Sequence, residues 1–170
     1  EGVSKENCTI YVSKGSKSKY ATTEQWKDFA NIVEFEGWCG DELLWAFDDE
    51  TGTLSIYGEG AMYNYSGSQN YAPWYDRREE IKSIKLIGAL TNIGDNAFDG
   101  CSEFSNIEIP ESVTSIGNNA FRYCYSLASV NIPASITSLG LNVFYSCHGI
   151  ASIVVDEKND TFEDVDGVLF

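Results

Sequence analysis

A single histidine and five cysteines are the residues of this 170-residue chain best suited to metal or nucleophilic chemistry. No two cysteines have the C-x-x-C spacing of a structural zinc site, and one histidine adds little to a ligand set. His148 has no serine or cysteine nucleophile with an orienting partner in its local sequence. A surface residue is therefore favoured over a catalytic base, and no metal or cofactor is expected.

The cysteines are odd in number, and three of them recur every 23 residues inside an apolar pattern: Cys101, Cys124 and Cys147. Cysteine in such a pattern behaves as a small buried hydrophobe, so a ladder of thiols is favoured over disulfides. A bridge between Cys8 and Cys39 remains an open alternative.

Carboxylates provide the remaining candidates for acid–base or metal chemistry. Asp41, Glu42 and Asp76 accompany an aromatic loop, but nothing in the sequence places two of them at the separation that glycoside hydrolysis needs. The acidic run 156–166 could offer oxygen ligands to Ca²⁺, yet its spacing does not fit an EF-hand, and a solvated loop is favoured. We therefore expect a protein that is not an enzyme.

Aromatic residues form two candidate binding patches. The first is the loop that contains Tyr63, Tyr65, Tyr71, Trp74 and Tyr75. Its rings could stack on sugars or anchor a protein, or they could seal the end of an apolar core, which is the favoured interpretation. The second candidate is a patch on the flank of the repeats, with scattered surface tyrosines as the simpler alternative; its members are Tyr123, Tyr125 and Tyr145.

These residues are positioned by a repeat that begins near residue 84. Ile93, Gly94, Phe98 and Cys101 recur with a period of 23 residues, twice over, and a fourth row drifts from the pattern. A fixed period of this size predicts a solenoid in which each repeat buries its apolar face against its neighbours. We expect an α/β solenoid, a right-handed superhelix with one short parallel strand per repeat and short helical or 3-10 turns on the convex side.

The strands should carry a polar face. Apolar residues alternate with polar ones around residues 84–86, 107–109, 130–132 and 153–155. The residues that alternate with the core form the concave surface that we call the strand face, a candidate recognition surface or a merely solvated sheet: Ser83, Lys85, Asn106, Glu108, Ser129, Asn131, Ser152 and Val154.

Three segments are predicted. Residues 1–37 should form one strand, at 9–12, and an amphipathic helix that starts at a Thr22–Gln25 capping box and includes Trp26, Phe29 and Val33. Residues 38–80 should form a β-hairpin and the aromatic loop, which together cap the repeats. Residues 81–170 should form the repeats, the last one incomplete, with an open sheet edge at 167–170.

Composition limits the partners. The net charge is −15, and an acidic surface repels nucleic acid and anionic lipid headgroups. Residues 123–155 carry no formal charge, but serines, threonines, asparagines and glycines interrupt them, so they are not a membrane span. No signal peptide opens the sequence, which suggests a processed chain or a piece of a longer one.

The repeat motif I-x-I-P-x-S-V-T-S-I-G-x-N-A-F-x-x-C-x-x-L, present in three copies over residues 84–153, resembles the BspA-like, Treponema-type leucine-rich repeat. Residues 39–75 resemble the module that often precedes such repeats in secreted proteins of gut bacteria. Residues 8–34 are similar to the segment that often closes these arrays.

This resemblance implies a secreted or cell-surface bacterial protein that adheres to host or bacterial surface proteins and glycoproteins. It offers no catalytic residues to transfer. A structural spacer that presents another domain, even a carbohydrate-active one, is the alternative. Because a closing segment precedes an open array here, head-to-tail self-association through residues 1–37 and the open edge is a further hypothesis.

Overall fold

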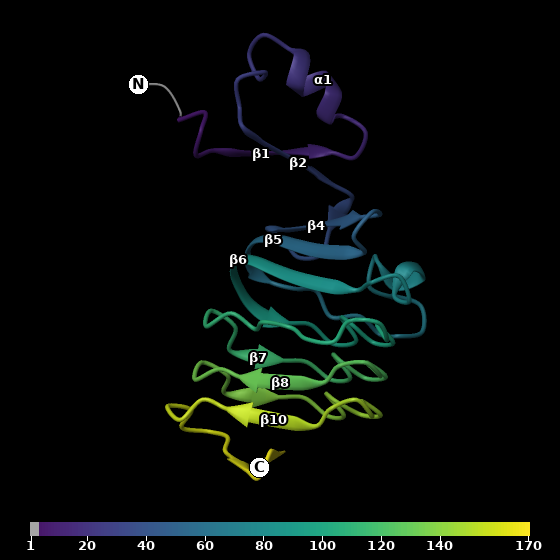
Figure 1. Ribbon diagram of the computed structural model, residues 1–170, viewed down its shortest axis with the longest axis vertical. Helices are drawn as coiled ribbons and strands as arrows, with labels where there is room; N and C mark the ends of the chain where they lie inside the picture. The colour runs from purple at the N-terminus through teal and green to yellow at the C-terminus, as the bar shows by residue number, and fades with distance from the viewer. Residues whose placement is uncertain (1–3) are drawn as a thin grey trace.

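The computed structural model describes residues 4–170 as a stack of coils with the N-terminal unit at one end and the C-terminus at the other (Figure 1). Within that range, no helix is both long and apolar enough to cross a bilayer. The strands are β1 Thr9–Ser13, β2 Asn31–Phe35, β3 Gly37–Trp38, β4 Leu43–Asp48, β5 Thr53–Ala61, β6 Ser83–Ile93, β7 Ser115–Ile116, β8 Ser129–Ile132, β9 Ser138–Leu139, β10 Ser152–Val155, β11 Asp164–Val165 and β12 Val168–Leu169. The helical elements are α1 Lys17–Thr22 and the 3-10 turn η1 Tyr75–Arg77.

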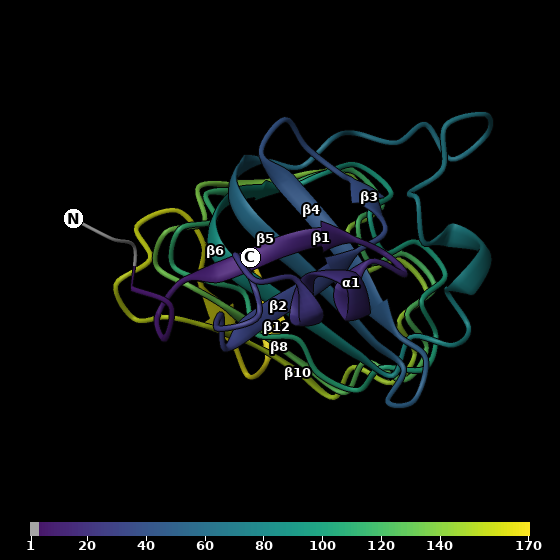
Figure 2. The ribbon, with the colours of Figure 1, turned by 90° about the horizontal axis from the view of Figure 1, so that it is seen from above.

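The main sheet has the order β3-β4-β5-β6-β7-β9. The predicted hairpin is present, because β4 and β5 pair antiparallel, and β6 then continues the sheet parallel to β5. Viewed down the stack, successive coils superimpose and η1 projects from one side (Figure 2).

The prediction of one strand per repeat is wrong, because two ladders run down the stack. One joins β6, β7 and β9 through Ile93, Ile116 and Leu139, and the other joins β8 to β10 with a 23-residue offset. Residues 106–109 keep the predicted alternation of buried and exposed side chains, yet they form no strand. Each 23-residue coil changes direction more than once, so it contains more than one short extended segment that can pair with the next coil.

Residues 95–100 and 118–123 form hydrogen-bonded turns where helical turns were predicted. The backbone has positive φ at Asn96, Gly100, Asn119 and Tyr123, which interrupts any right-handed helix. Alternate N–H groups in these turns donate to the next coil, as from Phe98 to Ala120 O at 2.8 Å. Bonds between coils thus replace the bonds that a helix would make within itself.

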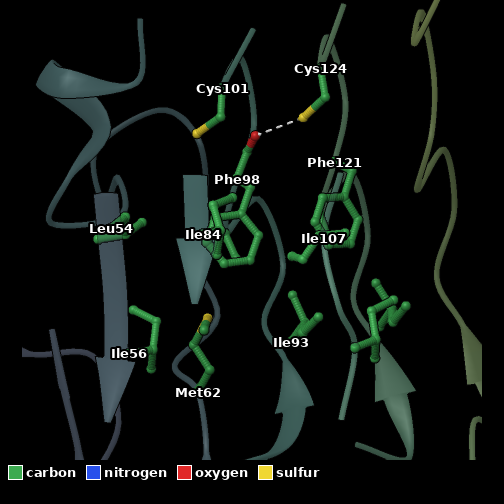
Figure 3. Packing of buried hydrophobic residues seen from close by; sticks show 14 of the residues in the cluster. Leu54, Ile56, Met62, Ile84, Ile93, Phe98, Cys101, Ile107, Phe121 and Cys124 are labelled. Carbon is green, nitrogen blue, oxygen red and sulfur yellow. Dashed lines mark hydrogen bonds between the residues drawn. The ribbon is translucent and has the colours of Figure 1, made fainter. Parts of the chain in front are cut away.

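The core is one continuous column inside the coils. The rings of Trp74, Phe98, Phe121 and Phe144 stack in order, with centroids 5.8, 5.4 and 5.7 Å apart. Figure 3 shows the Phe98 and Phe121 rings beside aliphatic side chains from several coils. Burial of this apolar surface is the main source of stability for the stack.

The cysteines of the repeat form the predicted thiol ladder. Cys101 and Cys124 are buried, Cys147 is half-buried, and the described cysteines, Cys8 and Cys39 included, are all free. Cys124 Sγ donates to Phe98 O at 3.3 Å, which Figure 3 marks, and Cys147 Sγ donates to Phe121 O at 2.9 Å. The open alternative of a bridge between Cys8 and Cys39 is thus decided against.

The amphipathic helix predicted to start at Thr22 is wrong. Helix α1 ends there, since Thr22 Oγ1 donates back to Ser18 O at 3.0 Å and Thr23 adopts an extended backbone. The chain then turns and forms β2, which pairs parallel with β1 in a 22-residue return. The apolar run at Ile32 and Val33 belongs to a strand, but it is too short for its periodicity to distinguish a strand from a helix.

The last residues fold back on the stack. β11 and β12 form a small antiparallel pair, and Ile153 N donates to Gly167 O at 3.0 Å. The predicted strand at 167–170 is therefore present, although it pairs with β11. Val165, Val168 and Phe170 remain exposed at this end.

Candidate functional site

The predicted strand face exists as one surface. Six of its eight side chains are exposed, and Ser83 and Ser152 are half-buried. Pairing of Ser55 with Lys85, and the 23-residue period that follows, align Ser55, Lys85, Glu108, Asn131 and Val154 in one column across the coils. This column therefore continues beyond the repeats onto β5, although Ser55 itself is buried.

Three grooves lie along this face. One of about 600 Å³ runs between residues 106–111 and 131–133. A second, of about 440 Å³, lies between residues 84–88 and Glu108. A third, of about 490 Å³, reaches from Lys85 across β4 and β5 to β2. Lys85 lines two of the grooves and Glu108 lines two, so the grooves form a continuous trough.

Residues 106–109 border two of these grooves. Within the described chain they make no backbone hydrogen bond, through either N–H or C=O, to the coils on either side. Their Ile107 and Ile109 side chains nevertheless anchor the segment in the core. Free backbone donors and acceptors therefore lie beside the floor of the trough, where a ligand can satisfy them.

The sequence did not reveal the apolar anchors at one end of the trough. Tyr57 and Ile87 are paired neighbours on β5 and β6, and Ile87 is 42% exposed. Tyr11 from β1 packs on Tyr57 with ring centroids 5.4 Å apart. The signal was available, because Tyr57 alternates with the core residue Ile56, but the contact with Tyr11 depends on the tertiary fold.

The predicted aromatic patch is divided by the fold. Trp74 and Tyr65 are buried, and Trp74 Nε1 donates to Ala97 O at 2.8 Å, so both seal the end of the core. Tyr71 and Tyr75 stack outside, at 4.1 Å between centroids. Tyr63 is exposed on its own, donating to Asp41 Oδ1 at 2.8 Å. These five rings therefore do not form one patch, as expected if a cap must bury an end of the column.

Among the remaining candidates, Asp156 of the acidic segment lines the groove beside residues 131–133. The carboxylates of Asp156 and Asp164 accept backbone N–H bonds from Lys158 and Val155 at 2.8 and 2.7 Å, which orders the acidic segment. Among residues 4–170, no group of three or more His, Cys, Asp or Glu is arranged to hold a metal ion. His148 stacks on Tyr125 with centroids 6.0 Å apart.

The family model for the BspA type leucine rich repeat region matches residues 74–165, in six copies. Among curated proteins, none matches the chain. The match starts at Trp74, which is the residue that begins the aromatic stack.

The solved structures that match the chain include three bacterial leucine-rich repeat proteins. A leucine-rich repeat protein from Eubacterium ventriosum is 21% identical, with a TM-score of 0.53 over 78% of this chain and 46% of its own. A leucine rich cell surface protein from Faecalibacterium prausnitzii is 14% identical, with a TM-score of 0.49 over 78% and 57%. A leucine rich repeat protein from T. pallidum is 18% identical, with a TM-score of 0.39 over 67% and 69%. The chain thus spans about half the length of the first two.

Proposed function

The chain belongs to the BspA type leucine-rich repeat family, and from this premise we propose that it is a non-enzymatic module that binds protein partners along the strand face. The observation that carries the proposal is the trough centred on residues 106–109, whose backbone has no partner in the described coils. Solenoid proteins commonly bind along such extended surfaces.

An extended polypeptide suits this surface. Main-chain groups of a bound segment can pair with the free N–H and C=O groups of residues 106–109, as in strand addition. Lys85 and Glu108 lie one coil apart in the same column, so they offer one charge of each sign to the partner. The partner's apolar side chain would contact Tyr57 and Ile87, since aromatic anchors contribute most to protein interfaces.

We place the module at the surface of a bacterium or outside it, where host or bacterial surface proteins and glycoproteins would be its partners. One structural neighbour is described as a leucine rich cell surface protein, which agrees with this placement. A net charge of −15 favours such partners over nucleic acid.

Binding to immobilised extracellular-matrix proteins, mucin and intact bacterial cells tests the proposal. Asn131→Arg should weaken retention about tenfold or more, because it introduces a bulky charge into the trough. Thr137→Arg is the matched control, an exposed position outside the strand face that receives the same side chain. Retention of Asn131→Arg at the wild-type level would refute the assignment of the strand face.

The alternative function is a structural spacer that presents another domain of a longer chain. It predicts that residues 1–170 bind none of these surfaces at micromolar concentration, while the full-length protein does. Unpaired backbone groups at 106–109 favour the binding module, because they have no role in a spacer and can be satisfied by a bound partner.

We also propose weak head-to-tail association of two copies. The two ends lie at opposite extremes of the stack (Figure 1). Helix α1 carries Lys17 and Lys19, whereas the other end carries the acidic run 156–166 beside the exposed Val168 and Phe170. Light scattering should show a mass that rises with concentration and falls with salt. A constant monomeric mass over a wide concentration range would exclude the contact.

A further inference from the structure

A strip of aromatic and arginine side chains runs down one flank of the coils and begins at η1. Figure 2 shows the turn of η1 projecting from the stack. We call this strip the tyrosine flank, and it is separate from the strand face. The tyrosine flank begins at Tyr75 and Arg78, beside Asp99 and Ser102. One coil further on it contains Arg122, Tyr123 and Tyr125. It ends at Tyr145 and His148.

The rings of the tyrosine flank contact one another across coils. Tyr123 lies 5.9 Å from Tyr145 and 6.0 Å from Tyr125, between ring centroids, and Tyr125 stacks on His148 at an interplanar angle of 7°. Tyr125 is 49% exposed and Tyr145 is 54% exposed. The Tyr125 and Tyr145 rings are therefore open to solvent, whereas the Tyr123 ring between them is half-buried.

Tyr123 occupies a backbone position that a tyrosine rarely adopts. Its φ is 61°, and the equivalent residue one coil earlier is Gly100, with φ 75°. A left-handed backbone costs a residue with a side chain roughly 1–2 kcal/mol, and glycine would avoid that cost here. Tyrosine is thus present at residue 123 although its backbone conformation favours glycine.

A groove of about 310 Å³ beside these rings contains fixed polar groups. Arg122 lies over the Tyr123 ring at 5.0 Å and donates to Asp99, and Arg78 lies over the Tyr75 ring at 4.3 Å. Arg78 Nη1 also donates to Tyr75 O at 3.0 Å, and its Nη2 donates to Glu79 Oε1 at 3.4 Å. Both guanidinium groups therefore have a carboxylate partner, and the groove offers hydrogen bonds without a free positive charge.

From this arrangement we propose that the tyrosine flank is a binding site for neutral saccharides. Exposed ring faces accept the apolar faces of sugar rings, and paired charges nearby supply donors and acceptors for hydroxyl groups. Acidic saccharides are disfavoured, because the chain carries a net charge of −15 and the groove has no unpaired cation. The exposed rings of Tyr125 and Tyr145, which come from successive coils, suit a linear oligosaccharide that lies along the stack.

Binding of the labelled protein to an array of neutral and acidic oligosaccharides tests this site. The wild type should bind neutral oligosaccharides, and Tyr125→Ala and Tyr123→Gly should each weaken that binding about five- to tenfold, the contribution of one stacked ring. Tyr123→Gly keeps the fold, because glycine adopts the φ of residue 123 without strain. Its urea midpoint should lie close to that of the wild type, because relief of the backbone strain offsets the lost ring contacts.

The strand-face variant Asn131→Arg is the matched control, and it should retain full saccharide binding. That control also separates this site from the proposed protein-binding trough. Binding to acidic oligosaccharides alone, no binding to neutral ones, or equal binding by wild type and Tyr123→Gly would each overturn the proposal.

Discussion

Arg122 and Asp99, 23 residues apart, form a two-bond ion pair between adjacent coils. Arg122 Nε donates to Asp99 Oδ1 at 3.0 Å, and Nη2 donates to Oδ2 at 2.6 Å. Asp99 is one of the two polar residues buried in the described chain, and the pair raises the pKa of the Arg122 guanidinium. The repeat period thus places two charges in register, although neither belongs to the shared motif.

Asp99→Asn should lower the free energy of unfolding by about 1–3 kcal/mol, because it replaces the buried carboxylate that pairs with the Arg122 guanidinium by a neutral amide. Urea denaturation followed by circular dichroism measures the change. Glu103→Gln is the control, an exposed side chain for which a change within about 0.5 kcal/mol is expected. Equal effects of the two substitutions would show that the ion pair contributes nothing.

Gly94→Ala should destabilise the stack by about 3 kcal/mol, because a Cβ there would overlap the carbonyl oxygen of Tyr63 in the previous coil. Gly15→Ala is the control, because it measures the cost of a positive φ without the cost of a steric overlap. Gly15 has φ 81° and no heavy atom within 4 Å of an added Cβ, so only about 1–2 kcal/mol is expected. A cost at Gly94 no larger than that at Gly15 would contradict close packing of the coils.

Phe121→Ala should cost about 3–5 kcal/mol, because it leaves a cavity between the Phe98 and Phe144 rings at the centre of the stack. Phe144→Ala should cost less, since Phe144 is only partly buried near the end of the column. Urea denaturation of both variants gives the order. The reverse order would mean that the coils do not share one continuous core.

Alkaline pH should lower the free energy of unfolding through the buried thiols of Cys39, Cys101 and Cys124. Burial raises the pKa of Cys39 to about 12, and burial also raises the pKa of Cys101 and Cys124. An unfolded thiol has a pKa of about 8.5, so above that pH the unfolded chain releases protons that the folded chain retains. The free energy of unfolding should therefore be unaffected by these groups below about pH 8 and fall between about pH 9 and 12.

Denaturation midpoints from pH 7 to 11 test the role of the thiols. Cys39→Ala removes one titrating group and should reduce the loss of stability between pH 9 and 11, whatever its effect at pH 7. Cys8→Ala, at a half-buried position outside the core, serves as the matched control. An identical pH dependence for Cys39→Ala and wild type would show that the Cys39 thiol does not contribute to the loss of stability at alkaline pH.

Period and alternation in the sequence predicted the stack itself. Three copies of the Ile-Gly-x-Asn-x-Phe pattern were enough to place Phe98, Phe121 and Cys124 in one core and to leave the strand face exposed. This works because a solenoid depends mainly on contacts between sequential neighbours, so local pattern and long-range packing coincide. The β4–β5 hairpin was predicted for the same reason, since its partners are adjacent in the chain.

Tertiary structure decided the features that depend on how coils meet. The alternation around Ile107 and Ile109 predicted a strand, but their backbone groups lack partners in the flanking coils, so a trough opens there. Trp26 and Val33 fitted a helix, yet pairing with β1 draws residues 31–35 into β2. Side-chain pattern specifies which face is buried, whereas hydrogen-bond partners are chosen only when two segments meet in space.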